Sequence, residues 1–404
     1  MSVGDRTSII DRLGWLLVLA PIMGVAMIAA AVHGFTLPLV ALVFDHWGLG
    51  AHLVGLNAAA GTCGILLLGP FLPGIIARVG LPRVVATAIA LATLALAALA
   101  ALPLLVAWFL AKALLGVSLS VIWACAELWI NLKVDDAHRG RAFSLFTLFY
   151  WFGFACGPGI IGLVGVDGAL PPLIGAGVMA TAFSLLLLMP PDSGRIDGAR
   201  ERRLPRTPLW PAVMVLATAV MGGMGDGTLP ALLPTFGLGH GAGEAGALAL
   251  LTAFVVGGVA FQWPVGWLAD KISERVLIFC CIGGAALCLA LLPLAVADVA
   301  LRLPLCFVAG GLFMSVSTLG LVAVGRTYSG GLLAVMSTWF SVLYEVGGTI
   351  GPVIAGMAMV RLGANGLPLT LALAGGIVLI LLLIGADRTR TSAVAVAPRL
   401  HPAP

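Results

Sequence analysis

Long apolar stretches run along almost the whole chain of 404 residues, separated at short intervals by charged residues, glycine and proline. A helix needs roughly 20 mostly apolar residues to cross the hydrocarbon layer of a bilayer. The strands of a membrane barrel would instead alternate apolar and polar residues. The continuous stretches therefore predict membrane-spanning helices, with approximate bounds 13–44, 52–76, 84–101, 104–130, 142–165, 170–190, 210–236, 245–269, 276–297, 303–324, 332–360 and 366–386.

The twelve stretches predict an all-α membrane protein whose first span is retained. Arg6 and Arg12 precede the first stretch, as they would in a signal peptide, but the apolar part of a signal covers only about 7–15 residues. This stretch continues to Phe44. The loops between the spans are too short for a soluble catalytic domain, so we predict that the protein is not an enzyme.

Composition supports membrane residence. Hydrophobic residues make up 61% of the chain and charged residues 9%, whereas soluble chains carry about 25% charged residues. This balance excludes a water-soluble globular protein and a disordered chain, and a net charge of +4 gives no reason to expect a nucleic-acid partner.

The basic residues indicate the orientation. If the N-terminus is inside, the alternation of spans puts 18 of the 21 Lys and Arg residues on the inner side, Arg302 and Arg361 on the outer side and Lys112 within a span. Basic residues near span ends stay in the cytoplasm. We therefore expect a multi-pass protein of the bacterial cytoplasmic (inner) membrane with both termini cytoplasmic.

The chain also contains an internal repeat. Thr36-Leu37-Pro38 with Phe44 recurs 192 residues later as Thr228-Leu229-Pro230 with Phe236, and matches in later spans keep nearly the same offset. Parallel repeats of this kind rock around a site near the middle of the bilayer. The expected division is an N-terminal six-helix half (1–190), a cytoplasmic linker (191–209), a C-terminal six-helix half (210–390) and a cytoplasmic tail (391–404). The third span of each triplet is bland, so we expect it to face lipid.

Two loops carry glycine and charged residues in a pattern that resembles the loop motif of the major facilitator superfamily, with Ala77 in place of the acid in the first loop and Ser273 in place of the second glycine in the second. Gln262-Trp263-Pro264 and three charged residues resemble its YcaD-like branch, and the resemblance covers essentially the whole chain. It implies twelve helices in two six-helix halves and transport by alternating access. The loop residues are Gly74, Arg78, Gly80, Arg83, Gly266, Asp270, Lys271 and Arg275, and the three charged residues are Glu127, Arg139 and Arg141.

We expect these loops and charges to form a gate, because an acid can pair with a helix N-terminus in one access state and lose it in the other. Glu127 is predicted to form a gate ion pair with Arg78 or Arg83. Glycines four residues apart give a close-packing helix face, and prolines after them weaken or kink the helix. The residues with this hinge or packing role are Gly153, Gly157, Pro158, Gly347, Gly351 and Pro352. The first three resemble the fifth-span motif of antiporters, and Lys112 with Gly116 resembles the fourth-span motif of proton-coupled members.

Charged residues deep in a membrane are costly and mark candidate functional sites. At 1.5 Å per residue, Glu345 lies roughly 20 Å and Asp226 roughly 24 Å from the inner surface. Carboxyls at this depth suit the binding and release of a proton. The alternatives are a fixed hydrogen bond for Glu345 and a polar helix-breaking site near the outer mouth for Asp226.

Four further residues are candidates for a substrate cavity. Lys112 lies roughly 12 Å from the outer end of its span, where it is a counter-charge for Asp226 or Glu345, a ligand for an anionic substrate, or a side chain that snorkels outward. His33 matches the height of Asp226 through the repeat and is a proton or substrate group, or a packing residue. Tyr150 and Tyr344 line the cavity or pack.

These observations favour a secondary transporter that moves a small solute by proton-coupled efflux. The alternatives are a facilitator or proton symporter for a metabolite and a transport-fold sensor or assembly factor. None of the three lysines follows a glycine, so the sequence contains no P-loop. We expect no cofactor, and the sequence shows no group of metal-ligating residues. The expected partners are a small-molecule substrate, protons and the lipid bilayer, and we expect a monomer.

Overall fold

The computed structural model describes residues 3–134, 136–188, 209–269, 271–328 and 330–396. Throughout these ranges the regular secondary structure is helical. The first half contains α1 (Val3–His46), α2 (Ala51–Leu68), η1 (Gly69–Phe71), α3 (Leu72–Val79), α4 (Leu81–Ala101), α5 (Leu105–Lys133), α6 (Asp136–Val164) and α7 (Leu170–Leu186). The second contains α8 (Leu209–Gly239), α9 (Gly243–Ala269), α10 (Glu274–Ala295), α11 (Val299–Thr327), α12 (Gly330–Leu362), η2 (Gly363–Asn365) and α13 (Gly366–Val396).

The helices follow the predicted apolar stretches closely, with one division that the sequence did not indicate. The predicted span 52–76 is shared among α2, η1 and α3, which together end at Val79. Gly80 follows with φ +90° and connects α3 to α4. A residue with a side chain adopts this backbone conformation only under strain, which explains the glycine of the first loop motif. At Ser273 in the second loop φ is −59°, so glycine is not needed there.

Nine stretches of the described helices are long and apolar enough to cross a membrane. One of them, Val335–Ile384, includes most of α12 and most of α13, and Leu170–Leu186 is a shorter apolar helix. Helix α8, which contains Asp226 and several glycines, is not among the nine. The total of twelve spans therefore stays a prediction.

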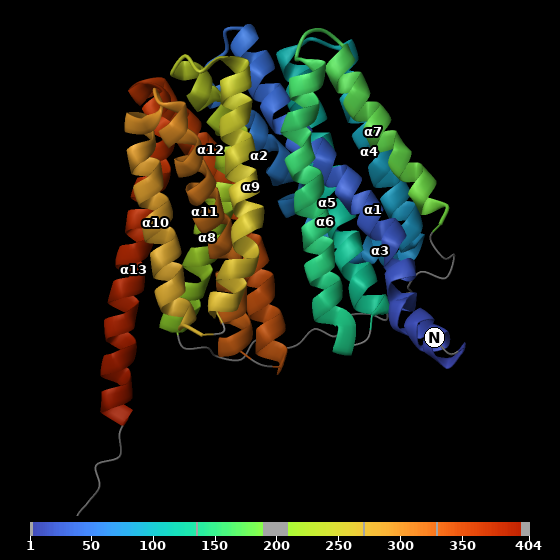
Figure 1. Cartoon of the computed structure of the whole chain (residues 1–404), viewed down its shortest axis with the longest axis vertical. Coiled ribbons are helices and arrows are strands. Elements are labelled where there is room, and N and C mark those ends of the chain that lie inside the picture. Colours follow the sequence, from blue (N-terminus) through green and yellow to red (C-terminus); the bar gives the residue numbers. More distant parts are fainter. Residues whose placement is uncertain (1–2, 135, 189–208, 270, 329, 397–404) are drawn as a thin grey trace, which may run out of the picture.

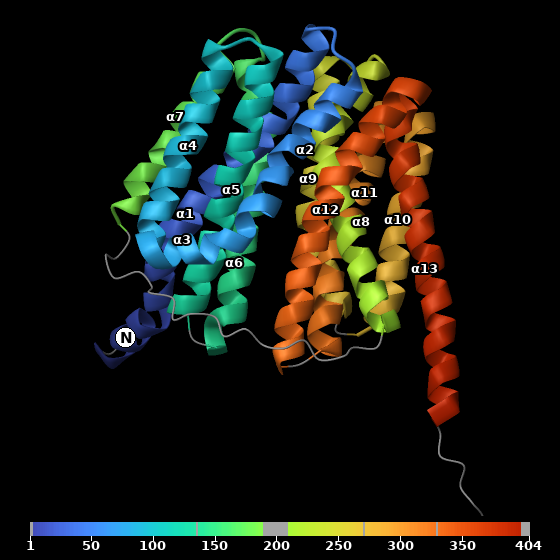
Figure 2. The same ribbon diagram turned by 180° about the vertical axis from the view of Figure 1, so that it is seen from behind.

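The helices form two bundles that stand side by side, as Figure 1 and the reverse view in Figure 2 show. In one bundle α1 packs on α6, and α4 packs on α5 and α7. In the other, α8 packs on α12, α9 on α11, and α10 on α11 and α13. Helices α4 and α7 lie on one flank of the molecule and α10 and α13 on the other, which agrees with the expectation that the third span of each triplet faces outward (Figure 1).

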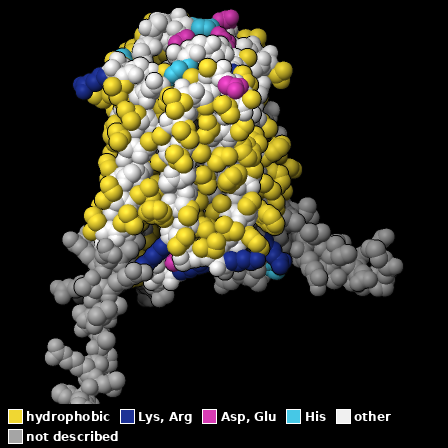
Figure 3. Space-filling view, turned by 60° about the vertical axis from the view of Figure 1, so that its left-hand side comes forward, with side chains coloured by type: hydrophobic (Ala, Val, Ile, Leu, Met, Phe, Trp, Pro, Cys, Tyr) yellow, Lys and Arg dark blue, Asp and Glu magenta, His cyan; other side chains and the backbone are white. Residues whose placement is uncertain are grey.

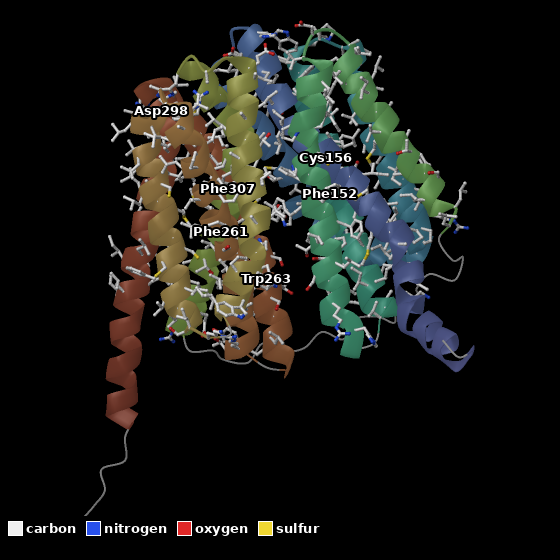
Figure 4. All side chains as sticks on the ribbon, viewed as in Figure 1. Phe152, Cys156, Phe261, Trp263, Asp298 and Phe307 are labelled. Atoms are coloured by element: carbon white, nitrogen blue, oxygen red, sulfur yellow. The ribbon has the colours of Figure 1, made fainter. Side chains whose placement is uncertain are left out.

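Within the second bundle, aromatic and capping contacts fix α11. Phe307 of α11 meets Phe261 of α9 edge to face at 5.9 Å between ring centres (Figure 4). Asp298, just before the first residue of α11, accepts a hydrogen bond from the backbone N–H of Ala300 at 2.9 Å (Figure 4). Such a cap satisfies one of the amide groups left free at a helix start.

A broad band of hydrophobic side chains covers the face in Figure 3, and most of the charged side chains gather at its two edges. Lys and Arg gather at one edge, here named the basic edge, where α3, α5 and α11 end and α6 and α10 begin. Its described basic residues are Arg78, Arg83, Lys133, Arg141, Lys271, Arg275 and Arg326. The opposite edge carries Asp45, His46, Asp167, Glu244 and Asp298 with Arg302 and Arg361. The start of α1 and the end of α13 both lie on the side of the basic edge (Figure 1).

Candidate substrate and proton site

Glycines bring α6 against α1 and α12 against α8. A Cβ atom at Gly153 would overlap the backbone of Met27, and one at Gly157 the backbone of Gly34. The repeat gives the second half the same arrangement, because Gly347 lies against the backbone of Val220. Gly351 lies against Thr228 Oγ1. Small residues thus let the helix backbones approach closely, as the sequence predicts.

The close packing positions a tyrosine three residues before each glycine pair. In the second half, the Tyr344 hydroxyl donates a hydrogen bond of 2.6 Å to Asp226 Oδ2 and so joins α12 to α8. The other carboxylate oxygen, Oδ1, is buried and has no hydrogen-bond partner among the described residues. Asp226 can therefore accept a further donor or carry a proton on its free oxygen.

Glu345 follows Tyr344 on α12 and is half-buried. Its side chain makes no hydrogen bond or ion pair with any residue that the structure describes. Tyr150 of α6 lies within electrostatic range of both Glu345 and Asp226. The two carboxyls of the second half therefore lie close enough to a phenol of the first half to influence its charge.

The first half adds two basic groups. The Tyr150 hydroxyl lies 3.4 Å from His33 Nδ1, and the His33 ring meets Phe154 edge to face at 5.5 Å. Lys112 lies within electrostatic range of His33 and is only 4% exposed. A Cβ at Gly61 would lie 3.3 Å from Lys112 Cε, so α2 packs directly against this lysine stem.

These residues form one group, here named the central cluster: His33, Lys112, Tyr150, Asp226, Tyr344 and Glu345. All six come from the candidates identified in the sequence, and they derive from α1, α5, α6, α8 and α12. The cationic side chain is in the first half and both carboxyls are in the second. Lys112 forms no ion pair with Asp226, Glu345 or any other described residue in this structure, so its role as a direct counter-charge stays a prediction.

An aromatic wall borders the first-half side of the cluster. Its members are Trp123, Tyr150, Trp151 and Phe154. The Tyr150 ring meets Trp123 at 4.4 Å and Trp151 at 5.6 Å, both edge to face. Trp151 in turn meets Phe154 at 5.5 Å. Such edge-to-face contacts are a favoured geometry for aromatic rings, and they hold Tyr150 in place.

The predicted gate ion pair is absent from the part of the chain that the structure describes. Glu127 is half-buried and hydrogen-bonds with Trp123, one helical turn earlier. Arg78 and Arg83 are exposed, and Arg83 donates to the backbone oxygen of Val79 at 3.4 Å. Glu127 therefore turns toward the aromatic wall, whereas the two arginines remain at the basic edge.

The remaining loop residues lie at the basic edge as expected. Lys271 Nζ stands 3.5 Å from the centre of the Trp267 ring. Asp270 lies outside the described residues, as does the side chain of Arg139. Sequence reasoning missed the role of Arg326, which donates to the backbone oxygen of Ala269 at 3.0 Å and pairs with Glu274 at 3.3 Å. The other motif residues in this region, Gly74, Arg141, Gly266 and Arg275, are exposed.

The two halves join between the central cluster and the opposite edge. Thr62 Oγ1 of α2 and Thr349 Oγ1 of α12 share a hydrogen bond of 2.8 Å. Nearer the opposite edge, Gly55 lies against the backbone of Pro352. At the edge itself, His46 Nε2 of α1 is 2.8 Å from Glu244 Oε1 of α9. Sequence reasoning found none of these contacts, because nothing in a single chain indicates which residues of two repeats will meet.

Toward the basic edge the halves separate. The ribbons of α2 and α12 diverge in that direction (Figure 2). Between Thr62 and the basic edge, the side chain of Leu67 is 75% exposed and that of Phe71 is 67% exposed. The halves therefore touch through α2 and α12 between the level of Thr62 and the opposite edge, and these two helices separate toward the basic edge.

The family of the chain follows from comparison with known proteins. The family model described as Major Facilitator Superfamily matches residues 19–251 and 214–402. The chain belongs to this superfamily, whose members move small molecules across membranes. It is a multi-pass membrane protein with bacterial relatives, and the family assignment made from the sequence is confirmed.

Among its relatives is the uncharacterized MFS-type transporter YfkF of Bacillus subtilis (strain 168). It is 24% identical over 345 residues, which cover 81% of this chain and 85% of the relative. The uncharacterized MFS-type transporter YcaD of Escherichia fergusonii is 25% identical over 291 residues, which cover 70% of this chain and 73% of the relative. The relation to the YcaD-like branch is confirmed at this modest identity.

Solved structures show the same fold. The D323A mutant of the nucleoside transporter NupG superposes with a TM-score of 0.76 at 13% identity and covers 91% of this chain and 99% of its own. A bacterial homologue of the human lysosomal transporter Spinster, inward-facing and unoccupied, gives a TM-score of 0.69 at 12% identity, with 92% and 95% covered. These likenesses confirm the major facilitator fold.

Proposed function

We propose that this protein is a secondary active transporter that exports a small solute across the bacterial inner membrane in exchange for protons. The central cluster is its binding site, and Asp226 and Glu345 carry the protons. The division into two six-helix halves, with the linker between them, is the mechanical basis of the transport cycle.

The observation that carries this proposal is the state of the two carboxyls. Asp226 has one oxygen bonded to Tyr344 and one buried oxygen without a described partner, and Glu345 has no described side-chain partner. A carboxyl that only held the fold together would have its hydrogen bonds satisfied. A carboxyl inside a membrane protein with an unsatisfied oxygen is instead suited to take up and release a proton.

The pattern of contacts between the halves supports alternating access. The basic edge is proposed to be cytoplasmic, since positively charged residues stay on that side. The structure then corresponds to an inward-facing state, with the outer side closed by α2 against α12 and by His46 against Glu244. Transport requires these contacts to break while the basic edge closes.

The test is transport by proteoliposomes with a trapped pH-sensitive dye and an imposed pH gradient. A panel of small organic solutes is offered to the wild type, Glu345→Gln and Asp226→Asn. We expect at least one solute to move protons in the opposite direction through the wild type, and each variant to lose most of this coupled movement. Asp45→Asn is the matched control, because Asp45 is exposed at the opposite edge and should leave coupling unchanged.

Each outcome has a definite meaning. If both cluster variants retain full gradient-driven transport, Asp226 and Glu345 do not carry the protons. If protons and solute move in the same direction, the protein is a symporter, and if solute moves without protons it is a facilitator. If no solute moves while the protein stays folded, the reading as a transport-fold sensor gains support.

A further inference from the structure

We propose that the solute bound by the central cluster is amphoteric, with an anionic group held by Lys112, a cationic group held by Asp226 and Glu345, and an apolar or aromatic body against the aromatic wall. This inference rests on the proposed function, because it takes the cluster to be the solute site. It goes further by naming the chemical class of the solute.

Lys112 is a buried basic residue of the first half. Its side chain is 4% exposed and belongs to the eighth residue of the 29-residue helix α5, with Gly61 of α2 packed against its stem. It forms no ion pair or hydrogen bond with any described residue. An ammonium group removed from water without a counter-ion is strongly unfavourable, so the site lacks an anion that the described residues do not supply.

The two carboxyls of the second half have no cationic partner among the described residues. Asp226 accepts only from the neutral Tyr344 hydroxyl, and Glu345 has no described partner. No Lys or Arg of the described chain pairs with either carboxyl. When they are ionised, these two groups lack a cation, just as Lys112 lacks an anion.

Two residues of the first half lie between Lys112 and the carboxyls in a series of interactions. Lys112 is in electrostatic range of His33, His33 lies 3.4 Å from Tyr150, and Tyr150 is in range of Asp226 and Glu345. Lys112 of the first half and the carboxyls of the second half are thus linked through His33 and Tyr150, each of which lies within electrostatic range of the next group. A ligand with both charges satisfies both ends at once, whereas a singly charged ligand leaves one end unpaired.

The aromatic wall offers a surface for the middle of the proposed ligand. Between the charged ends the first half presents the aromatic wall, in which Trp123 and Trp151 flank Tyr150. Aromatic faces and edges favour an apolar or aromatic body, and their faces also attract cations. The cationic end of the solute competes with protons for Asp226 and Glu345, which links substrate class to exchange.

The test uses three matched triads of ligands on the detergent-purified full chain. Each triad contains a free amino acid, its amide, which keeps only the cation, and its N-acetyl derivative, which keeps only the anion. The amino acids are alanine, leucine and phenylalanine. Affinity is measured by isothermal titration, and ligand-induced thermal stabilisation is a second readout.

For the wild type we expect the free amino acid of at least one triad to bind about tenfold or more tightly than either of its derivatives, since a charge-assisted contact supplies at least that factor. Lys112→Met should reduce the preference over the amide to about one. Asp226→Asn should do the same for the preference over the N-acetyl derivative. Lys112→Arg keeps the charge and should keep most of the preference.

Lys133→Met is the matched control, because Lys133 lies on the same helix at the basic edge and its loss should leave all ratios unchanged. The proposal is overturned if no free amino acid binds, if a singly charged derivative binds as tightly as its parent, or if Lys112→Met keeps the wild-type preference in a folded protein. The liposome assay reports proton coupling separately, so a wrong substrate class and a wrong coupling mechanism give different results.

Discussion

Helices α2 and α12 pack so closely that one added methyl group in their contact should change the ratio of the two access states. A Cβ at Gly356 would lie 2.8 Å from the backbone oxygen of Ala51 and 3.0 Å from His52 Cα. Both atoms belong to the other half and to backbone, so neither can move aside as a flexible side-chain end could. Gly356→Ala therefore disfavours this state and leaves the packing inside each half unchanged.

The magnitude follows from the cost of overpacking. An extra methyl group in a well-packed contact costs about 1–3 kcal/mol, and each 1.4 kcal/mol changes an equilibrium about tenfold. We expect Gly356→Ala to shift the ratio of the two access states by roughly five- to 150-fold toward the state with the opposite edge open. Gly159→Ala is the control, because nothing lies within 4 Å of a Cβ at that position.

The assay measures distances between pairs of spin labels in a cysteine-free background. One pair is placed at the exposed residues Leu102 and Asn365 near the opposite edge, and the other at Leu132 and Ile272 near the basic edge. For Gly356→Ala the first distance should lengthen and the second should shorten. Distance distributions identical to those of Gly159→Ala would refute the reasoning that this contact stabilises the state in which the opposite edge is closed.

Two further predictions concern the loop motif and the central cluster. Gly80→Ala places a side chain at φ +90°, where there is open space but the backbone is strained. Thermal unfolding should therefore show a loss of about 1–2 kcal/mol in the free energy of unfolding. The control Gly74→Ala, also in open space, should cost less than half of that. Tyr344→Phe removes the 2.6 Å hydrogen bond to Asp226. It should lower the free energy of unfolding by about 1–3 kcal/mol and reduce proton-coupled transport. The control Tyr328→Phe, which removes a hydroxyl without a described partner, should do neither, and equal effects of the two variants would count against the role of the hydrogen bond.

Much of the fold could be predicted from the chain because the bilayer restricts the choices. A span must be helical, apolar and about 20 residues long, so α4, α5 and α9 begin and end within a few residues of their predicted bounds. The division of the second span into α2, η1 and α3 was not predicted, because Gly69-Pro70 and Pro73 are compatible with a continuous membrane helix as well as with a broken one.

The candidate site was predicted in part. The scarcity of charge made Lys112, Asp226 and Glu345 visible, and the repeat pointed to His33, Tyr150 and Tyr344. Their assembly into one cluster depends on which helix faces the centre. The ion pair predicted for Glu127 is not formed among the described residues of this state, and its height in the membrane could be estimated from the sequence but its direction toward Trp123 could not.

The sequence by itself determined the class of protein, because hydrophobicity, basic residues and repeat are properties that each segment carries alone. Only the tertiary structure decided that Lys112 has no ion-pair partner among the described residues, that Tyr344 binds Asp226, and that the halves meet through Gly55, Gly356 and His46. These facts depend on the rotation of each helix and on the access state, and both are set by side-chain packing between segments far apart in the chain.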